Sequence, residues 1–141
     1  MKSLRSIAIG LGMLFATVSA VQAQEVRVKA DVPFAFTVAG KVLPAGNYFL
    51  TSSGVSDTAL VIRNEDQNAT ALTVTNSCRK LDPASSTKLV FHRVGDQYFL
   101  YQIWTEGNSA GRQLRAPSAE KMLAQNHGVE TVIVAANLAS R

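Results

Sequence analysis

The chain has 141 residues, with 14 lysines and arginines against 10 aspartates and glutamates, and one cysteine, Cys78. This length suits one domain with one core, and a single cysteine cannot form an internal disulfide. The basic residues are scattered, so no basic stripe points to nucleic acid.

The first 23 residues predict an export signal. Lys2 and Arg5 precede an apolar run at 7–20, and Val21-Gln22-Ala23 fits the pattern before a signal peptidase cut. The run is shorter than the roughly 20 residues of a membrane-crossing helix. We therefore expect a signal peptide at 1–23, a periplasmic or secreted protein, and no transmembrane segment in the mature chain. Residues 24–141 then form a single β-rich domain with 12 basic and 10 acidic residues, a net charge of +2.

Alternating apolar residues predict strands in the first half of this domain. The expected strands are Val26–Ala30, Phe34–Val38, Asn47–Ser53, Ala59–Arg63 and Ala69–Thr75. Pro33 should separate the first two of these strands, and Leu43-Pro44-Ala45-Gly46 suits a type I turn. Polar loops are expected at Gly54–Thr58 and Asn64–Asn68, and the stretch Asn76–Thr87 reads as a long irregular connection.

A β-hairpin is the clearest feature of the second half. Lys88–Val94 and Gln97–Trp104 flank Gly95-Asp96, a two-residue loop that matches the twist of paired strands. The predicted register pairs residues whose numbers sum to 191: His92 with Phe99, Phe91 with Leu100, Arg93 with Tyr98 and Val90 with Tyr101. Both faces are apolar, which places the hairpin centrally in a sheet.

The C-terminal third predicts a polar loop, a helix and a last strand. The loop is Thr105–Arg112, the helix Pro117–Gln125 with an apolar patch at Met122 and Leu123, and the strand Val129–Ala136. The fold class is therefore all-β and mainly antiparallel: a β-sandwich or flattened barrel of about eight short strands with one short helix near the C-terminus.

Residues with catalytic potential are few. His92 and His127 lack metal-ligand spacing; His92 reads as a sheet histidine and His127 as a partner of the helix C-terminus. Arg79 and Lys80 beside Cys78 would favour its thiolate, so a thiol-dependent enzyme using Cys78 and His92 is one hypothesis. An unreactive cysteine or one paired with another chain are its alternatives. We predict no metal site, no cofactor and no enzyme.

Two further segments permit binding. Glu106, Asn108 and Arg112 in the glycine-rich loop are candidate binding residues, against the alternative of a plain connection. The aromatic side chains of the hairpin (Tyr98, Phe99, Tyr101 and Trp104) would either line a barrel lumen that carries a small apolar ligand or fill the core.

Several strings together resemble a recurrent family of small exported, β-rich bacterial proteins. They are Asp31–Val38, Leu43–Tyr48, Leu60–Asn64, Lys88–Arg93, Gly95–Leu100 and Trp104–Asn108. The resemblance spans most of residues 24–136; that family has no assigned activity, so it implies no functional residue. The Leu-Pro-Ala-Gly-x-Tyr turn is also similar to a strand connection in prealbumin-type sandwiches, which implies a sandwich and no enzyme.

The leading functional hypothesis is a non-catalytic exported domain with an envelope-structural or binding role. Its partner would be an envelope protein or polysaccharide and not nucleic acid. The alternatives are the apolar-ligand carrier and the thiol-dependent enzyme.

Overall fold

The computed structural model describes residues 27–53, 58–66 and 69–139. The predicted signal peptide at 1–23 lies outside them, as does most of the predicted loop at Gly54–Thr58. The described elements are β1 Arg27–Val32, β2 Phe36–Val38, β3 Lys41–Leu43, β4 Gly46–Ser53, β5 Ala59–Asn64, β6 Thr70–Arg79, β7 Lys88–Val94, β8 Gln97–Trp104, β9 Ala110–Leu114, α1 Ser118–Asn126 and β10 Val129–Leu138.

Eight of these strands close into a barrel. Their order is β8-β7-β10-β1-β4-β5-β6-β9, and the pairing of β9 with β8 completes the ring. Neighbouring strands in the ring are antiparallel. The β2–β3 hairpin is an addition, since β2 runs parallel to β8 where Thr37 meets Phe99. The predicted all-β flattened barrel with one short C-terminal helix is confirmed.

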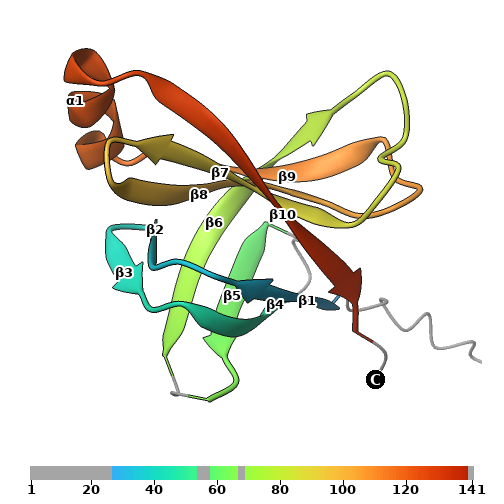
Figure 1. Ribbon diagram of the computed structural model, residues 1–141. Helices are drawn as coiled ribbons and strands as arrows, with labels where there is room; N and C mark the ends of the chain where they lie inside the picture. Colours follow the sequence, from blue (N-terminus) through green and yellow to red (C-terminus); the bar gives the residue numbers. More distant parts are fainter. Residues whose placement is uncertain (1–26, 54–57, 67–68, 140–141) are drawn as a thin grey trace, which may run out of the picture.

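Two long strands turn the corners of the barrel. Figure 1 shows β1, β4 and β5 in one half and β7, β8 and β9 in the other, with β6 and β10 passing between the halves. β10 pairs with β7 from Val129 to Ala135 and with β1 from Ala136 onward. β6 pairs with β5 up to Val74 and with β9 from Thr75 onward. Strands that switch sheets in this way are typical of orthogonal packing.

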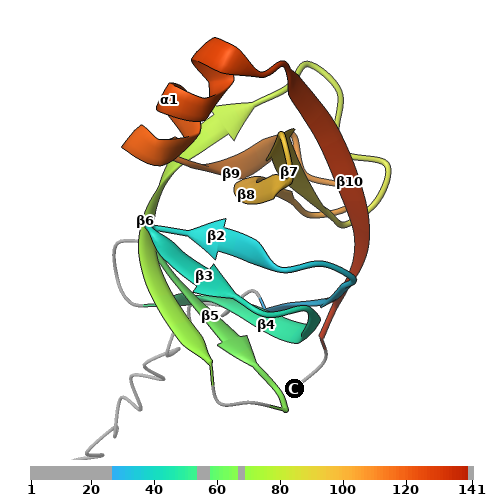
Figure 2. The same cartoon turned by 60° about the vertical axis from the view of Figure 1, so that its left-hand side comes forward.

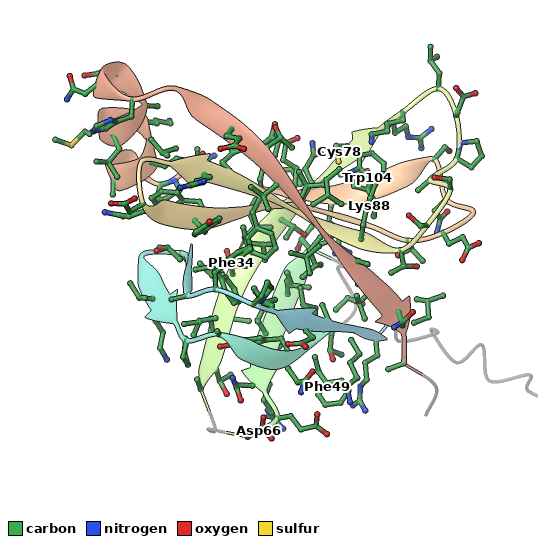
Figure 3. The ribbon with its side chains drawn as sticks, viewed as in Figure 1. Phe34, Phe49, Asp66, Cys78, Lys88 and Trp104 are labelled. Carbon is green, nitrogen blue, oxygen red and sulfur yellow. The ribbon has the colours of Figure 1, made fainter. Side chains whose placement is uncertain are left out.

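Side chains from both halves meet in the barrel interior. The Phe36 ring lies edge-on to Tyr48 and to Phe91, with ring centroids 5.0 and 5.4 Å apart. Phe34, between the two halves in Figure 3, stacks on Tyr98 at 3.8 Å. Burial raises the pKa of the Tyr48 hydroxyl, which donates to the Pro44 carbonyl. These aromatic contacts form the centre of the core.

The hairpin of β7 and β8 has the predicted strand ends and turn, and Gly95 has the positive φ that the turn requires. Three of the four named pairs are confirmed, but the pairing of Val90 with Tyr101 is wrong. The register shifts between Val90 and Phe91, so Val90 pairs with Gln102 and Tyr101 is the extra residue of a β-bulge.

Other boundaries also differ from the prediction. β6 continues to Arg79 through the stretch expected to be irregular, because β9 supplies a backbone partner for Thr75–Arg79. β9 itself includes Ala110–Arg112, which were expected in a loop. The two-residue turn at Ala39 and Gly40, both with positive φ, creates the unpredicted strand β3.

Helix α1 covers only part of its predicted apolar patch, since Leu123 is half-buried. Met122 is exposed, whereas Glu120 is buried on the outer surface of β7. A helix of two turns buries only a narrow strip of its surface against a sheet. In α1 the Glu120 carboxylate, which contacts His92 of β7, lies in that strip. Within the described residues, no helix is long and apolar enough to cross a membrane.

Candidate functional site

The outer face of β1, β4 and β5 holds two cations over one aromatic ring and a third on the neighbouring strand. In strands, residues two apart share a face, so Arg27 and Lys29 both point outward beside the buried Val28. The register places Lys29, Phe49 and Arg63 opposite one another on three neighbouring strands. Figure 3 shows Phe49 on the side of β4 that faces away from the interior. We call Arg27, Lys29, Phe49, Arg63 and Glu65 the Phe49 surface.

The Phe49 ring supports two of these cations. The Arg27 guanidinium carbon lies 5.7 Å and the Lys29 ammonium 5.1 Å from the ring centroid. Both distances suit cation–π attraction, and the long side chains can pack their stems on the ring while their charges meet water. Phe49 therefore limits the conformations of both side chains.

One carboxylate balances part of this charge. Glu65 lies 3.2 Å from Lys29, and both side chains are more than two-fifths exposed. Within the described part of the chain, no carboxylate lies within ion-pair distance of Arg27 or Arg63. The five residues of the Phe49 surface thus include three cations and one anion, and Asp31, the next outward residue of β1, adds a second carboxylate beside them. The remaining excess of positive charge favours an anionic ligand.

A second polar cluster lies under α1. The His92 Nδ1 is 2.6 Å from the Glu120 Oε1, and the His92 ring stacks on Tyr101 at 3.9 Å. Glu120 is 5% exposed, so its carboxylate depends on this contact. The reading of His92 as a sheet histidine with a partner agrees with this arrangement, while the exposed His127 ends the helix.

Cys78 lies on β6 and not in a surface connection, so the expected location was wrong. It pairs with Gly111 and packs beside Trp104, Ala84 and Val90, as Figure 3 shows for Cys78 and Trp104. Burial raises the pKa of its thiol, only partly offset by the Gly111 hydrogen bond and by Lys80. His92 contacts Glu120 and Tyr101 instead, so the two residues of the thiol-enzyme hypothesis have separate surroundings.

The candidate binding residues of the 105–112 segment do not converge. Glu106 and Asn108 are exposed in a turn that backbone hydrogen bonds join to the 80–87 connection, including Ala84 N–H to Asn108 O at 2.9 Å. Arg112 lies on β9 and donates to the Thr75 hydroxyl at 3.3 Å. Their role as binding residues stays a prediction. The backbone of the segment fixes the 80–87 connection in place through its hydrogen bonds.

The hairpin aromatics divide between two faces. Tyr98 packs against the central core, whereas Trp104 and Tyr101 belong to the cluster around Val90. Phe99 pairs with His92 and shares its outward face. Three of the four rings therefore cover the outside of the barrel rather than lining an interior space.

No family model, curated protein or solved structure matches this chain. Among the described residues, no group of three histidine, cysteine or acidic side chains could hold a metal ion. The Phe49 surface was missed from the sequence because its members are separated by up to 38 positions, between Arg27 and Glu65. The alternation around Val28 predicts a common face for Arg27 and Lys29, but only the strand register adds Phe49 and Arg63.

Proposed function

We propose that this protein is a non-catalytic, exported β-domain that binds an acidic polysaccharide of the cell envelope through the Phe49 surface. The observation that carries the proposal is the row Lys29–Phe49–Arg63 with Arg27 above the same ring. The export signal predicted at 1–23 supplies the compartment in which such a polymer is met.

Carboxylates on a sugar chain fit the chemistry of this row. Arg27 and Arg63 can each hold a carboxylate with two parallel hydrogen bonds, and Lys29 adds a point charge. Three exposed cations give weak binding at one site, which a repeating polymer strengthens through multiple contacts. A net charge of +2 on the predicted mature chain is low for a protein that tracks a nucleic-acid backbone.

The proposal assigns no reaction to Cys78 and His92. The thiolate is the nucleophilic form of cysteine, and the burial that raises the Cys78 pKa opposes it. The imidazole of His92 has the Glu120 carboxylate as its partner. Both residues therefore serve packing and attachment of neighbouring elements in this proposal.

Affinity electrophoresis through polygalacturonate or alginate tests the proposal. We expect retardation that weakens with added salt and is absent in dextran, which is neutral. The triple variant Arg27→Gln, Lys29→Gln, Arg63→Gln should lose about tenfold or more in affinity, if each pair contributes up to about 1 kcal/mol. The triple variant Arg79→Gln, Arg115→Gln, Lys121→Gln removes the same charge at three other exposed positions; it is the matched control and should bind more tightly than the first triple variant.

Two outcomes would overturn the proposal. The triple variant would bind the acidic polymers as well as the unaltered protein does, or duplex DNA or anionic lipid vesicles would bind more tightly than either polysaccharide at equal salt.

A further inference from the structure

We infer that the acidic polysaccharide bound by the Phe49 surface carries small apolar substituents, namely O-acetyl esters, which contact Val61, Leu72 and Val74. We call these three residues the apolar strip. The inference rests on the proposed function, because the cations of the Phe49 surface would hold the carboxylates of the same polymer. It adds the class of polysaccharide, and its basis is an exposed apolar surface beside those cations.

The strand register places the apolar strip next to the cations on the same outer face. Outward residues of β1, β4, β5 and β6 form parallel rows: Lys29–Phe49–Arg63–Thr70, then Arg27–Thr51–Val61–Leu72, then Ala59–Val74. Figure 2 shows β4, β5 and β6 side by side in this half of the barrel. A ligand on the row of Lys29 and Arg63 therefore has apolar neighbours one row away.

The apolar strip is accessible to a ligand. Leu72 is 66% and Val74 67% exposed, and Val61, directly opposite Leu72, is half-buried. Neighbouring exposed apolar side chains gain free energy from any contact that removes them from water, and such patches mark binding sites. Contact with an apolar substituent of the ligand would supply this gain.

The carboxylates near the cations direct the polymer toward the apolar strip. Asp31 and Glu65 each follow a cation of the row by two positions, and both lie on the side of the row away from the strip. At the other end of the strip, the exposed Arg115 lies beside Val74 in the continued register of β6 and β9, and it adds no negative charge there. An anionic polymer is repelled from the side of the two carboxylates and so lies over the strip.

The spacing suits one sugar that carries both a carboxylate and an ester. Arg63 is directly opposite Thr70, so Leu72 is its diagonal neighbour on the same face, roughly 7–8 Å away. A sugar ring with a carboxylate at one end and an acetyl ester on a hydroxyl across the ring spans such a distance. Arg63 can therefore hold the carboxylate while Leu72 contacts the methyl group of the ester.

The same face fits a lipid surface less well. Its exposed apolar side chains are leucine and valine, which project from a sheet and have little reach. Among the rows named above, the aromatic ring is that of Phe49, and it lies under two cations. Surfaces that enter a membrane present tryptophan, phenylalanine or many leucines to the acyl chains.

Affinity electrophoresis of the unaltered protein through alginate and through O-acetylated alginate of equal chain length tests the inference. Acetylation of hydroxyls leaves the carboxylates charged, so the two polymers differ in their apolar groups. We expect acetylation to tighten binding about threefold to fourfold, the effect of burying one methyl group. Acetylated dextran, which has no carboxylate, should not retard the protein.

A double variant identifies the residues that contact the esters. Leu72→Thr with Val74→Thr keeps the preference for a strand and every cation, so it should bind both alginates as the unaltered protein binds the unacetylated one. Ile133→Thr is the matched control. Ile133 is 59% exposed on β10, where it pairs with β7 in the other half of the barrel, so this variant should still prefer acetylated alginate.

The outcomes separate this inference from the proposed function. Equal binding of both alginates by the unaltered protein would overturn the inference alone, and so would a preference for acetylated alginate that survives in the double variant. Failure to bind either alginate would overturn both proposals. Tighter binding to anionic lipid vesicles, or a dimer that the double variant converts to monomer, would show that a different partner covers the apolar strip and would also overturn the inference.

Discussion

Glu120 is the polar residue with the most demanding surroundings. Its carboxylate is almost fully buried and has the His92 ring as its partner, with Tyr101 stacked on the same ring. The helix that carries Glu120 has no side-chain cap at Pro117 and no basic residue in its last turn. Because capping and charge at its ends add little stability to α1, the Glu120–His92 contact should be what holds the helix on the barrel.

Glu120→Ala should therefore lower the free energy of unfolding by about 1–3 kcal/mol, the usual cost of leaving a buried polar partner unsatisfied. Denaturant melts measure this loss. Glu106→Ala, at an exposed carboxylate, should change stability by less than about 0.5 kcal/mol. In a His92→Ala background the effect of Glu120→Ala should shrink, and equal losses in both backgrounds would show that the two groups do not depend on each other.

Cys78 should react slowly because its burial raises the thiol pKa above the ordinary value of about 8.5. The folded protein keeps this proton at a pH where the unfolded chain releases it. The contribution of the Cys78 thiol to the free energy of unfolding is thus complete below the ordinary pKa of the thiol and declines as the pH rises above that value. At pH 8.5, iodoacetamide should label native protein more slowly than guanidinium-unfolded protein. Cys78→Ser, which removes no disulfide and should fold normally, supplies the blank; equal labelling rates would contradict a shielded thiol.

At the scale of elements, the sequence predicted correctly the strands whose own residues favour a strand and whose turn has a specific signal. The two runs around Gly95-Asp96 combine β-branched and aromatic residues with a specific turn, so their ends were correct. The bulge at Tyr101 has no local signal, because it arises from fitting β8 against both β7 and β9. β9 is polar and contains Gly111, so its own residues do not favour a strand. It is a strand because β6 and β8 supply backbone hydrogen-bond partners on both sides.

The close approach of β9 to β8 gives a prediction about Gly111. A Cβ at this position would lie 2.7 Å from the Trp104 ring and 2.9 Å from the Ile103 carbonyl oxygen. Gly111→Ala should therefore cost about 1–3 kcal/mol through overpacking, measured by thermal or denaturant unfolding. Gly128→Ala is the matched control, because a Cβ there meets no atom within 4 Å. Equal stability of the two variants would mean that Trp104 can move aside at little cost.

The candidate site shows a different limit of sequence-based prediction. Alternation assigns Arg27, Phe49 and Arg63 to outward positions on their own strands. Their meeting depends on which strands are neighbours and on a register set by pairings across the whole barrel. A shift of one residue would turn every outward side chain inward, so the buried residues between them fix the Phe49 surface indirectly.

At the scale of the whole molecule, the packing of the barrel interior discriminates between a surface-binding domain and a carrier of an apolar ligand. The two halves meet through Phe34, Phe36, Tyr48 and Phe91, whose rings contact one another across the centre. A ligand would have to displace these contacts, since a well-packed interior has little free volume. The carrier hypothesis would thus require the halves to separate.

Phe91→Ala tests this reasoning on the complete protein. Phe91 is fully buried and touches both Phe34 and Phe36, so its removal should cost about 3–5 kcal/mol and leave an apolar cavity. A small apolar molecule such as benzene should raise the melting temperature of this variant, because a ligand that binds only the folded state stabilises it. The unaltered protein should show no such rise, because its own side chains occupy that space. A rise of equal size in both proteins would mean that the native barrel already admits an apolar ligand, and the carrier hypothesis would then become the leading functional proposal.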